Sequence, residues 1–230
     1  MRRVMILVMT VALVWPASLV AADATVPAAR YLVMVRHGHH STEPVSDPAK
    51  GPPLTPLGKD QARLAARRVQ ESLFPLDAVL ASPMLRSQET AQAIVGELKA
   101  ARLILLPDLT ECTPPMPPEQ SATLKNTEEL KACADQFNRV FDAYVRPSEG
   151  AESGQVLVAH ANVIRYLLTR AMGLDARAWQ QFSLSHGSVT TLRIAANGTV
   201  TVLGVGDIGH VPRSQRSGSI IDADSSRRPR

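Results

Sequence analysis

Short apolar runs separated by amphipathic segments make up most of the sequence. Residues 31–35 are apolar throughout, as a strand buried on both faces of a sheet requires, and residues 155–159 have the same character after Gln155. Residues 77–81, apolar after Asp77, and 103–106 form two further short runs. These four runs predict strands of one sheet.

The segments between the runs repeat apolar residues at helical spacing. Thr55-Pro56 is a typical cap and first helical residue, and Ser82-Pro83 repeats that pattern ahead of a second helix. Two more helices are predicted over 127–144 and 162–172. The buried faces of the first two helices are expected to carry Ala62, Ala65, Ala66, Val69 and Leu73, and Ala91, Ile94, Val95 and Leu98.

The last patterned region reads as a hairpin. Residues 188–194 and 199–203 are strand-like, and the Asn197-Gly198 pair between them favours a type I′ turn. Strands that alternate with helices predict an α/β fold with three αβα layers and a largely parallel central sheet. The hairpin would add an antiparallel edge.

The N-terminal residues follow a different pattern. Two arginines precede an apolar run over 4–15, and small residues follow over 17–24. The run is shorter than the roughly 20 residues that span a bilayer, so we expect a secretory signal peptide over 1–22, with an uncleaved anchor as the alternative. This predicts a periplasmic or secreted protein with no stable membrane insertion after signal cleavage.

Charge is spread unevenly along the chain. The formal net charge is +4, but residues 23–212 carry 18 basic and 19 acidic side chains, and an Arg/Ser-rich stretch occupies 213–230. A nearly neutral body with few aromatic residues does not favour nucleic-acid binding. We therefore expect one folded domain over 23–212 and a disordered tail over 213–230.

Arginine and histidine side chains gather where the predicted strands end. Arg36-His37 follows the first strand, His160 follows the strand 155–159, and Arg86 lies in the first turn of the second helix. Ligands of such sheets bind beyond the carboxyl ends of the strands. A guanidinium group suits phosphate, a neutral imidazole can attack phosphorus, and the helix dipole disfavours a cation at Arg86 unless an anion compensates it. Together these residues predict a phosphate pocket with a nucleophile.

A metal site is the alternative reading of this region, because His39 and His40 follow His37 closely. Arg36 would repel a cation there, and no carboxylate follows until Glu43. We therefore expect neither a metal ion nor another cofactor.

Two cysteines, Cys112 and Cys133, are the only ones in the chain. In an exported protein they could pair, and a disulfide that closes a loop of about 20 residues adds roughly 3 kcal/mol of stability. The sequence leaves this pairing and two unpaired thiols equally open, since it does not show whether the two residues approach each other.

These motifs resemble the histidine phosphatase superfamily, also called the phosphoglycerate-mutase-like family. The family signature Arg-His-Gly stands here as Arg36-His37-Gly38. The later segments are similar to one branch, the phosphoglycerate-mutase-like serine/threonine protein phosphatases known from mitochondria. The segments that match the superfamily are 54–58 with Gln61-Ala62, Ser82-Pro83 with Arg86, Glu89 and Thr90, and 158–160. The segments that match the branch are Leu109-Thr110-Glu111, 160–166, Ser188 and 206–209.

The resemblance implies a role for each pocket residue. His37 would take the phosphoryl group, while Arg36, Arg86 and His160 would hold its oxygens. Glu111 would protonate the leaving oxygen and later activate water, since Ala161 occupies the position where the acid-phosphatase branch has an acid. Two further implications concern neighbours of these residues: Asn162 is a candidate for substrate binding, and a Cys112–Cys133 disulfide would fix the loop that carries Glu111.

The resulting interpretation is an exported, metal-independent phosphomonoester hydrolase that works through a phosphohistidine on His37. Its substrate would be a phosphoprotein or a phosphorylated small molecule, and a protein serine/threonine phosphatase is one candidate. The alternative is a phosphate-binding or interaction protein of the same fold with weak turnover. A homo-oligomer is left open by the sequence.

Overall fold

The computed structural model describes residues 28–99, 101–117 and 126–219. The predicted signal peptide therefore lies outside the described residues, as does the tail from 220 onward. The elements are β1 (Arg30–Arg36), α1 (Pro56–Gln70), β2 (Ala78–Ala81), α2 (Leu85–Leu98), β3 (Arg102–Leu105), η1 (Pro107–Leu109), α4 (Thr127–Tyr144), β4 (Ser153–Ala159), α5 (Ala161–Ala171), η2 (Ala176–Gln181), β5 (Val189–Ile194), β6 (Val200–Asp207) and η3 (Arg213–Gln215).

The strands form one sheet in the order β3-β2-β4-β1-β5-β6. β1, β2, β3 and β4 run parallel to one another, whereas β5 pairs antiparallel with both β1 and β6. The predicted α/β fold with a largely parallel sheet and an antiparallel edge is therefore confirmed. The parallel register pairs Arg36 with Ala159 and Ala81 with Val158, so β1, β2 and β4 end at the same edge.

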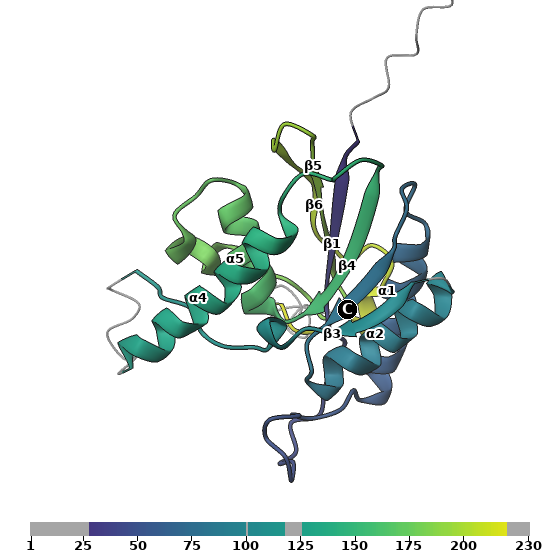
Figure 1. Ribbon diagram of the computed structural model, residues 1–230. Coiled ribbons are helices and arrows are strands. Elements are labelled where there is room, and N and C mark those ends of the chain that lie inside the picture. Colours follow the sequence, from purple (N-terminus) through teal and green to yellow (C-terminus); the bar gives the residue numbers. More distant parts are fainter. Residues whose placement is uncertain (1–27, 100, 118–125, 220–230) are drawn as a thin grey trace, which may run out of the picture.

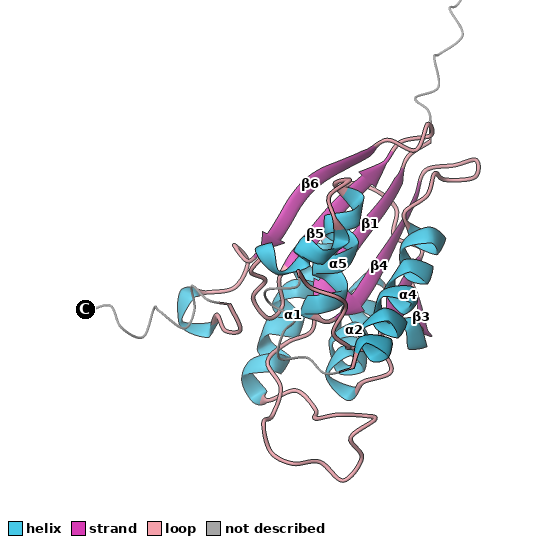
Figure 2. Cartoon of the chain, turned by 90° about the vertical axis from the view of Figure 1, so that its left-hand side faces the viewer, coloured by secondary structure: helices cyan, strands magenta, loops and turns pink. Residues whose placement is uncertain are grey.

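Helices cover both faces of the sheet, with α1 and α2 on one side and α4 and α5 on the other (Figures 1 and 2). Alternate residues of β1 pack into the two cores on opposite faces of the sheet. Leu32 and Met34 pack into the core between the sheet and α4 and α5, and Val33 and Val35 into the core between the sheet and α1 and α2. Full burial of such side chains contributes about 1.5–3 kcal/mol each. The apolar runs thus form strands because both faces are buried.

The two expected helix starts have different outcomes. Thr55 caps α1 as predicted, because its Oγ1 accepts a hydrogen bond from the Gly58 amide at 3.1 Å. α2 begins only at Leu85, and its N-cap residue, Met84, makes no side-chain cap. The prediction of a Ser82 cap is wrong because Ser82 lies ahead of the N-cap, where its Oγ accepts a hydrogen bond from the Met84 amide at 3.3 Å. The same hydroxyl lies 2.9 Å from His160 Nε2, in the pocket described below.

The hairpin between β5 and β6 is present, but its turn differs from the expected type I′. A type I′ turn needs two residues with positive φ. Only Gly198, at φ 84°, lies in that region, and the Gly198 amide donates to the Ala195 carbonyl at 2.9 Å. The Asn-Gly pair therefore occupies a longer connection, in which glycine alone takes the left-handed conformation.

The C-terminal segment 213–219 is folded against the domain, which corrects the expected boundary at residue 212. Gln61 Nε2 donates to the Gln215 carbonyl at 2.6 Å and to Ser217 Oγ at 3.1 Å, and Arg36 Nη1 donates to the Gly218 carbonyl at 2.7 Å. The Gln61 and Arg36 side chains thus hold segment 213–219 against the domain, and the composition of the segment does not record such contacts. Within the described residues, no helix is long and apolar enough to cross a membrane.

Candidate active site

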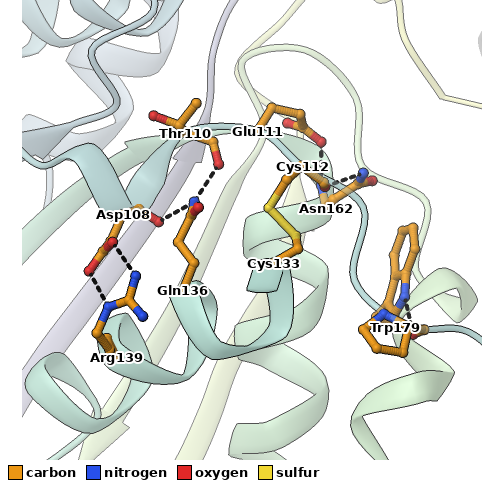
Figure 3. The surroundings of a disulfide bond; sticks show 10 residues. Asp108, Thr110, Glu111, Cys112, Cys133, Gln136, Arg139, Asn162 and Trp179 are labelled. Atoms are coloured by element: carbon orange, nitrogen blue, oxygen red, sulfur yellow. Dashed lines mark hydrogen bonds and ion pairs between the residues drawn. A yellow bond between two sulfur atoms is a disulfide. The ribbon is translucent and has the colours of Figure 1, made fainter. Parts of the chain in front are cut away.

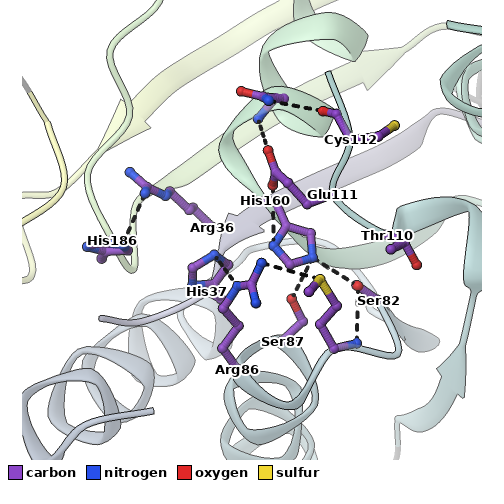
Figure 4. Close-up of polar contacts among 12 residues, drawn as sticks. Arg36, His37, Ser82, Arg86, Ser87, Thr110, Glu111, Cys112, His160 and His186 are labelled. Carbon is purple, nitrogen blue, oxygen red and sulfur yellow. Dashed lines mark hydrogen bonds and ion pairs between the residues drawn. The ribbon is translucent and has the colours of Figure 1, made fainter. Parts of the chain in front are cut away.

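The centre of the site is His37, which follows β1 and is only 3% exposed. Its Nε2 accepts a hydrogen bond from Arg86 Nε at 3.1 Å (Figure 4). Its Nδ1 lies 2.8 Å from the Gly38 carbonyl. Because a guanidinium can only donate, Nε2 must carry the lone pair and Nδ1 the proton. The backbone therefore fixes the tautomer in which Nε2 keeps its lone pair, which is the form that nucleophilic attack would require.

The protonation state of His37 suits this role. Burial, the neighbouring His160 and the positive charges of Arg36 and Arg86 lower the pKa of His37 well below its ordinary value of 6.5, although the hydrogen bond to Gly38 acts in the opposite direction. An imidazolium would have to be buried beside two guanidinium groups, which is costly. The ring is therefore neutral near pH 7.

His160 follows β4 and is fully buried beside His37, with their ring centroids 4.9 Å apart. Its Nε2 lies 2.9 Å from Ser82 Oγ, so a residue that follows β2 orients a ring that follows β4. Its Nδ1 lies 3.3 Å from a Glu111 oxygen, but the angles are unsuitable for a hydrogen bond. Burial, followed by the charges of Arg86 and Arg36, lowers the pKa of His160 well below 6.5.

Two guanidinium groups flank these rings. Arg86 lies in the first turn of α2, a turn without an acidic residue, and is 8% exposed. Arg36 donates to the Leu184 and Gly218 carbonyls, and its Nη2 lies 3.0 Å from His186 Nε2. A buried cation at a helix N-terminus opposes the helix dipole, so an anion in the pocket would stabilise Arg86.

Glu111 reaches the pocket from the loop that follows η1. One carboxylate oxygen accepts from the Asn162 amide at 3.3 Å at the start of α5, and the other faces His160. Asn162 also donates from Nδ2 to the Cys112 carbonyl at 3.0 Å. Asn162 therefore holds the loop at two points, the Glu111 carboxylate through its backbone amide and the Cys112 carbonyl through its side chain. The Glu111 side chain remains 27% exposed.

Helix α4 anchors the same loop (Figure 3). Cys112 and Cys133 form a disulfide, which decides between the paired and unpaired cysteines. Three residues further along α4, Gln136 Nε2 donates to the Asp108 and Thr110 carbonyls at 3.0 and 2.8 Å. Arg139, another three residues along, binds the Asp108 carboxylate through two nitrogens. One face of α4 thus positions the loop that carries Glu111.

A histidine that was given no role from the sequence, His186, completes the wall of the site. Its ring centroid lies 5.5 Å from that of His37, and burial, with Arg36 and His39 nearby, lowers the pKa of His186 to about 2. The Arg36 contact requires an unprotonated Nε2, so His186 Nδ1 carries the proton and donates to Ser217 Oγ at 3.0 Å. Its sequence position, just before β5, gave no signal because β5 runs antiparallel.

His39 and His40 do not favour the metal alternative. His39 Nδ1 lies 2.9 Å from Thr55 Oγ1, and His40 Nδ1 lies 2.8 Å from the Ser41 carbonyl. Each ring is thus held by its own loop, and the charged neighbours of His40 are arginines rather than carboxylates.

The candidate site is a cavity of about 370 Å³, and most of the expected site residues line it. A larger hollow of about 610 Å³ lies beside the disulfide, but its described lining contains no arginine or histidine. The chemistry therefore identifies the smaller cavity as the site. Its lining consists of Arg36, His37, His40, Arg86, Glu111, Ala161, Asn162, Arg165 and Gly218.

Comparison with known proteins identifies the same fold and motifs. The model of the histidine phosphatase superfamily (branch 1) matches residues 32–116 and 114–206. The serine/threonine-protein phosphatase Pgam5, mitochondrial, of Drosophila grimshawi is 36% identical over 195 residues, which are 80% of this chain and 65% of that protein. The Drosophila willistoni protein of the same name is 33% identical over 199 residues, with the same shares covered. The chain thus spans just under two thirds of these relatives.

Solved structures share the fold at lower identity. Phosphoglycerate mutase from Plasmodium falciparum aligns with a TM-score of 0.56 at 24% identity, over 80% of this chain and 95% of its own. YhfR from Bacillus stearothermophilus aligns with a TM-score of 0.62 at 17% identity, over 80% of this chain and all of its own. These likenesses confirm the phosphoglycerate-mutase-like fold.

The curated relatives correct the expected location. They are mitochondrial proteins, which contradicts a periplasmic or secreted protein. The expectation rested on a basic and apolar pattern at the N-terminus, and that segment lies outside the described residues. Such a pattern reports hydrophobicity and charge, which do not by themselves specify a compartment.

Proposed function

The chain belongs to the histidine phosphatase superfamily, and on that premise we propose that it hydrolyses phosphomonoesters through a phosphohistidine on His37. One observation carries the proposal: His37 lines a cavity together with Arg36 and Arg86, and its Nε2 keeps a lone pair because the Gly38 carbonyl holds the proton on Nδ1. The mechanism requires no metal ion, because guanidinium groups offset the phosphate charge.

The first step transfers the phosphoryl group. Phosphate oxygens replace His37 Nε2 as the acceptor of the Arg86 hydrogen bond, which frees the lone pair. The N–P bond forms as the bond from phosphorus to the leaving oxygen breaks, and Glu111, in its protonated form, gives its proton to that oxygen. Arg36, Arg86 and His160 stabilise the charge that develops on the remaining oxygens.

The second step restores the enzyme. Glu111, now a carboxylate, takes a proton from a water molecule as the water oxygen attacks phosphorus. The N–P bond breaks, its electron pair returns to His37 Nε2, and inorganic phosphate leaves. The position of Glu111 beside His160 and the Asn162 amide supports this double role.

Phosphorylated serine or threonine in proteins is the substrate class that we propose. The curated relatives, which are serine/threonine-protein phosphatases, support it, as does the partial exposure of Glu111 in the lining of the cavity. Such a side chain could present its phosphate to His37 while the rest of its protein stays outside.

The test is hydrolysis of para-nitrophenyl phosphate in EDTA by the wild-type chain and by His37→Ala. We expect activity that survives EDTA and falls by at least about 10³-fold in the variant, together with an acid-labile phosphoryl group on wild-type His37. Activity that persists in His37→Ala would contradict the mechanism. Phosphate binding without any turnover in the wild type would instead support the alternative, a binding protein of this fold.

A further inference from the structure

One cation of the cavity, Arg165, has no task in the mechanism above. It lies three residues beyond Asn162 on α5 and lines the same cavity. The side chain is partly buried, and its Nε is shielded from solvent without a hydrogen-bond partner among the described residues. Arg36 and Arg86, by contrast, donate hydrogen bonds to neighbouring groups.

The placement of Arg165 relates it to the leaving group rather than to the phosphoryl group. Residues three apart on a helix share a face, so Arg165 follows Asn162 on the same side of α5. The Asn162 amide binds Glu111, the group proposed to protonate the leaving oxygen. The first turns of α5 therefore border the side of the cavity from which the leaving group departs.

The charge balance of the cavity gives Arg165 a ligand. Three guanidinium groups and one carboxylate line the cavity, and that carboxylate must be protonated when it acts as an acid. Arg36 and Arg86 suffice to offset a phosphomonoester dianion. A third partly desolvated guanidinium is then left without an anion, which is unfavourable unless the substrate supplies one.

We propose that Arg165 forms a second anion subsite that binds a carboxylate carried by the leaving group. The inference rests on the proposed phosphatase function and narrows its substrate class. The carboxylate would come from an acidic residue beside the phosphorylated residue of a protein, or from a small phosphorylated acid.

Two matched pairs of substrates separate these sources. The first pair is a phosphoserine peptide with Glu beside the phosphorylated residue and the same peptide with Gln there. The second pair is free phosphoserine and phosphoethanolamine, which differ only by the carboxylate. We expect kcat/KM to be about tenfold higher for the anionic member of at least one pair, as charge-assisted hydrogen bonds allow. Equal values within both pairs would overturn the subsite.

Substitutions then assign the preference to Arg165. Arg165→Gln should bring the ratio within each pair close to one, Arg165→Lys should retain part of it, and Arg165→Glu should favour a peptide with Lys in place of Glu. Arg63→Gln is the matched control, because Arg63 is exposed on α1 and pairs with Asp60. A preference that survives in Arg165→Gln would also overturn the proposal.

Binding measurements keep this inference separate from the proposed function. Calorimetry with the His37→Ala protein compares the affinities of the Glu and Gln phosphopeptides without turnover. If the wild type does not hydrolyse any substrate but the peptide preference persists and depends on Arg165, the subsite stands and the proposed function fails. If hydrolysis through His37 is intact and neither assay shows a preference, the function stands and the subsite fails.

Discussion

The two sides of the cavity are built in different ways. On the side proposed to bind the phosphoryl group, called the phosphate side here, His37, Ser82 and His160 directly follow β1, β2 and β4, and the ladder that pairs Arg36 with Ala159 sets their separation. On the side proposed to face the leaving group, called the leaving-group side, Glu111 stands on a loop that Asn162, Gln136 and a disulfide hold in place. Backbone pairing thus positions one side, and side-chain contacts position the other.

This difference implies a division of labour. In the proposed function the phosphate side recognises a group that is the same in every substrate, so a rigid sheet edge suits it. The leaving-group side meets the part of the substrate that varies, and loops carry such variable functions. Substitutions on the loop side should therefore change the response to the leaving group more than the affinity for phosphate.

The largest effect on that side is expected from Glu111→Gln, which keeps the size of the side chain but removes its acid-base chemistry. For an alkyl phosphate such as phosphoserine, kcat should fall by roughly 10²–10⁴-fold. For para-nitrophenyl phosphate the fall should be smaller, because its leaving group needs little protonation. Steady-state kinetics with both substrates measures the difference.

The control for this variant is Glu128→Gln, at an exposed position in the first turn of α4. It should leave both rates close to those of the wild type. An equal loss of kcat for the two substrates in Glu111→Gln would assign Glu111 to phosphate binding. The proposed division between a phosphate side and a leaving-group side would then be wrong.

A smaller effect is expected from the double variant Cys112→Ser, Cys133→Ser. The disulfide links residues 21 apart, so its loss should lower the free energy of unfolding by about 3 kcal/mol in the chain-entropy model. We also expect kcat for phosphoserine to fall by about tenfold, since Glu111 directly precedes Cys112 and loses one anchor. Inhibition by inorganic phosphate should weaken less than kcat falls.

Denaturant titration and steady-state kinetics under native conditions test these two effects separately. A non-reducing peptide map of the parent protein provides the control, because it should contain Cys112 and Cys133 in one linked fragment. If the affinity for inorganic phosphate falls by the same factor as kcat, the disulfide-anchored loop also positions the residues of the sheet edge, which would contradict the division between the two sides.

The smallest effect is expected from mild acidification. His37 and His160 have pKa values well below 6.5, so their imidazole nitrogen resonances should show no titration midpoint between about pH 8 and 6.5. The unfolded chain binds protons at these rings near pH 6.5, whereas the folded chain does not, so stability should fall as the pH drops below that value. Nitrogen NMR detects the protonation state of each ring. A titration midpoint above pH 6.5 for His37 or His160 would refute the prediction that both imidazoles are neutral near pH 7.

Local patterns were sufficient to predict much of the fold and half of the site. The apolar runs became strands close to their expected limits, and the predicted helix over 127–144 corresponds to α4. Arg36, His37, Arg86 and His160 were placed together correctly, because parallel strands bring the residues that follow them to one edge. Family motifs, rather than physical patterns, brought Glu111 and Asn162 into the expected site.

Other features depended on contacts that no local pattern records. Ser82 looked like a helix cap, yet its hydroxyl orients His160 across the sheet edge. Segment 213–219 looked disordered by composition, yet its carbonyl groups accept hydrogen bonds from Arg36 and Gln61. His186 lies in the loop just before β5, which runs antiparallel, so the rule for parallel strand ends could not find it.

The sequence by itself therefore determined the order of strands and helices, the edge at which they place His37, and the cationic character of that edge. These properties follow from residue spacing and strand direction, which are local. The tertiary structure decided the His37 tautomer, the pairing of the cysteines, the packing of segment 213–219 against the domain and the position of Arg165 at the cavity. Each of these depends on the distance between atoms far apart in the chain, and only packing sets that distance.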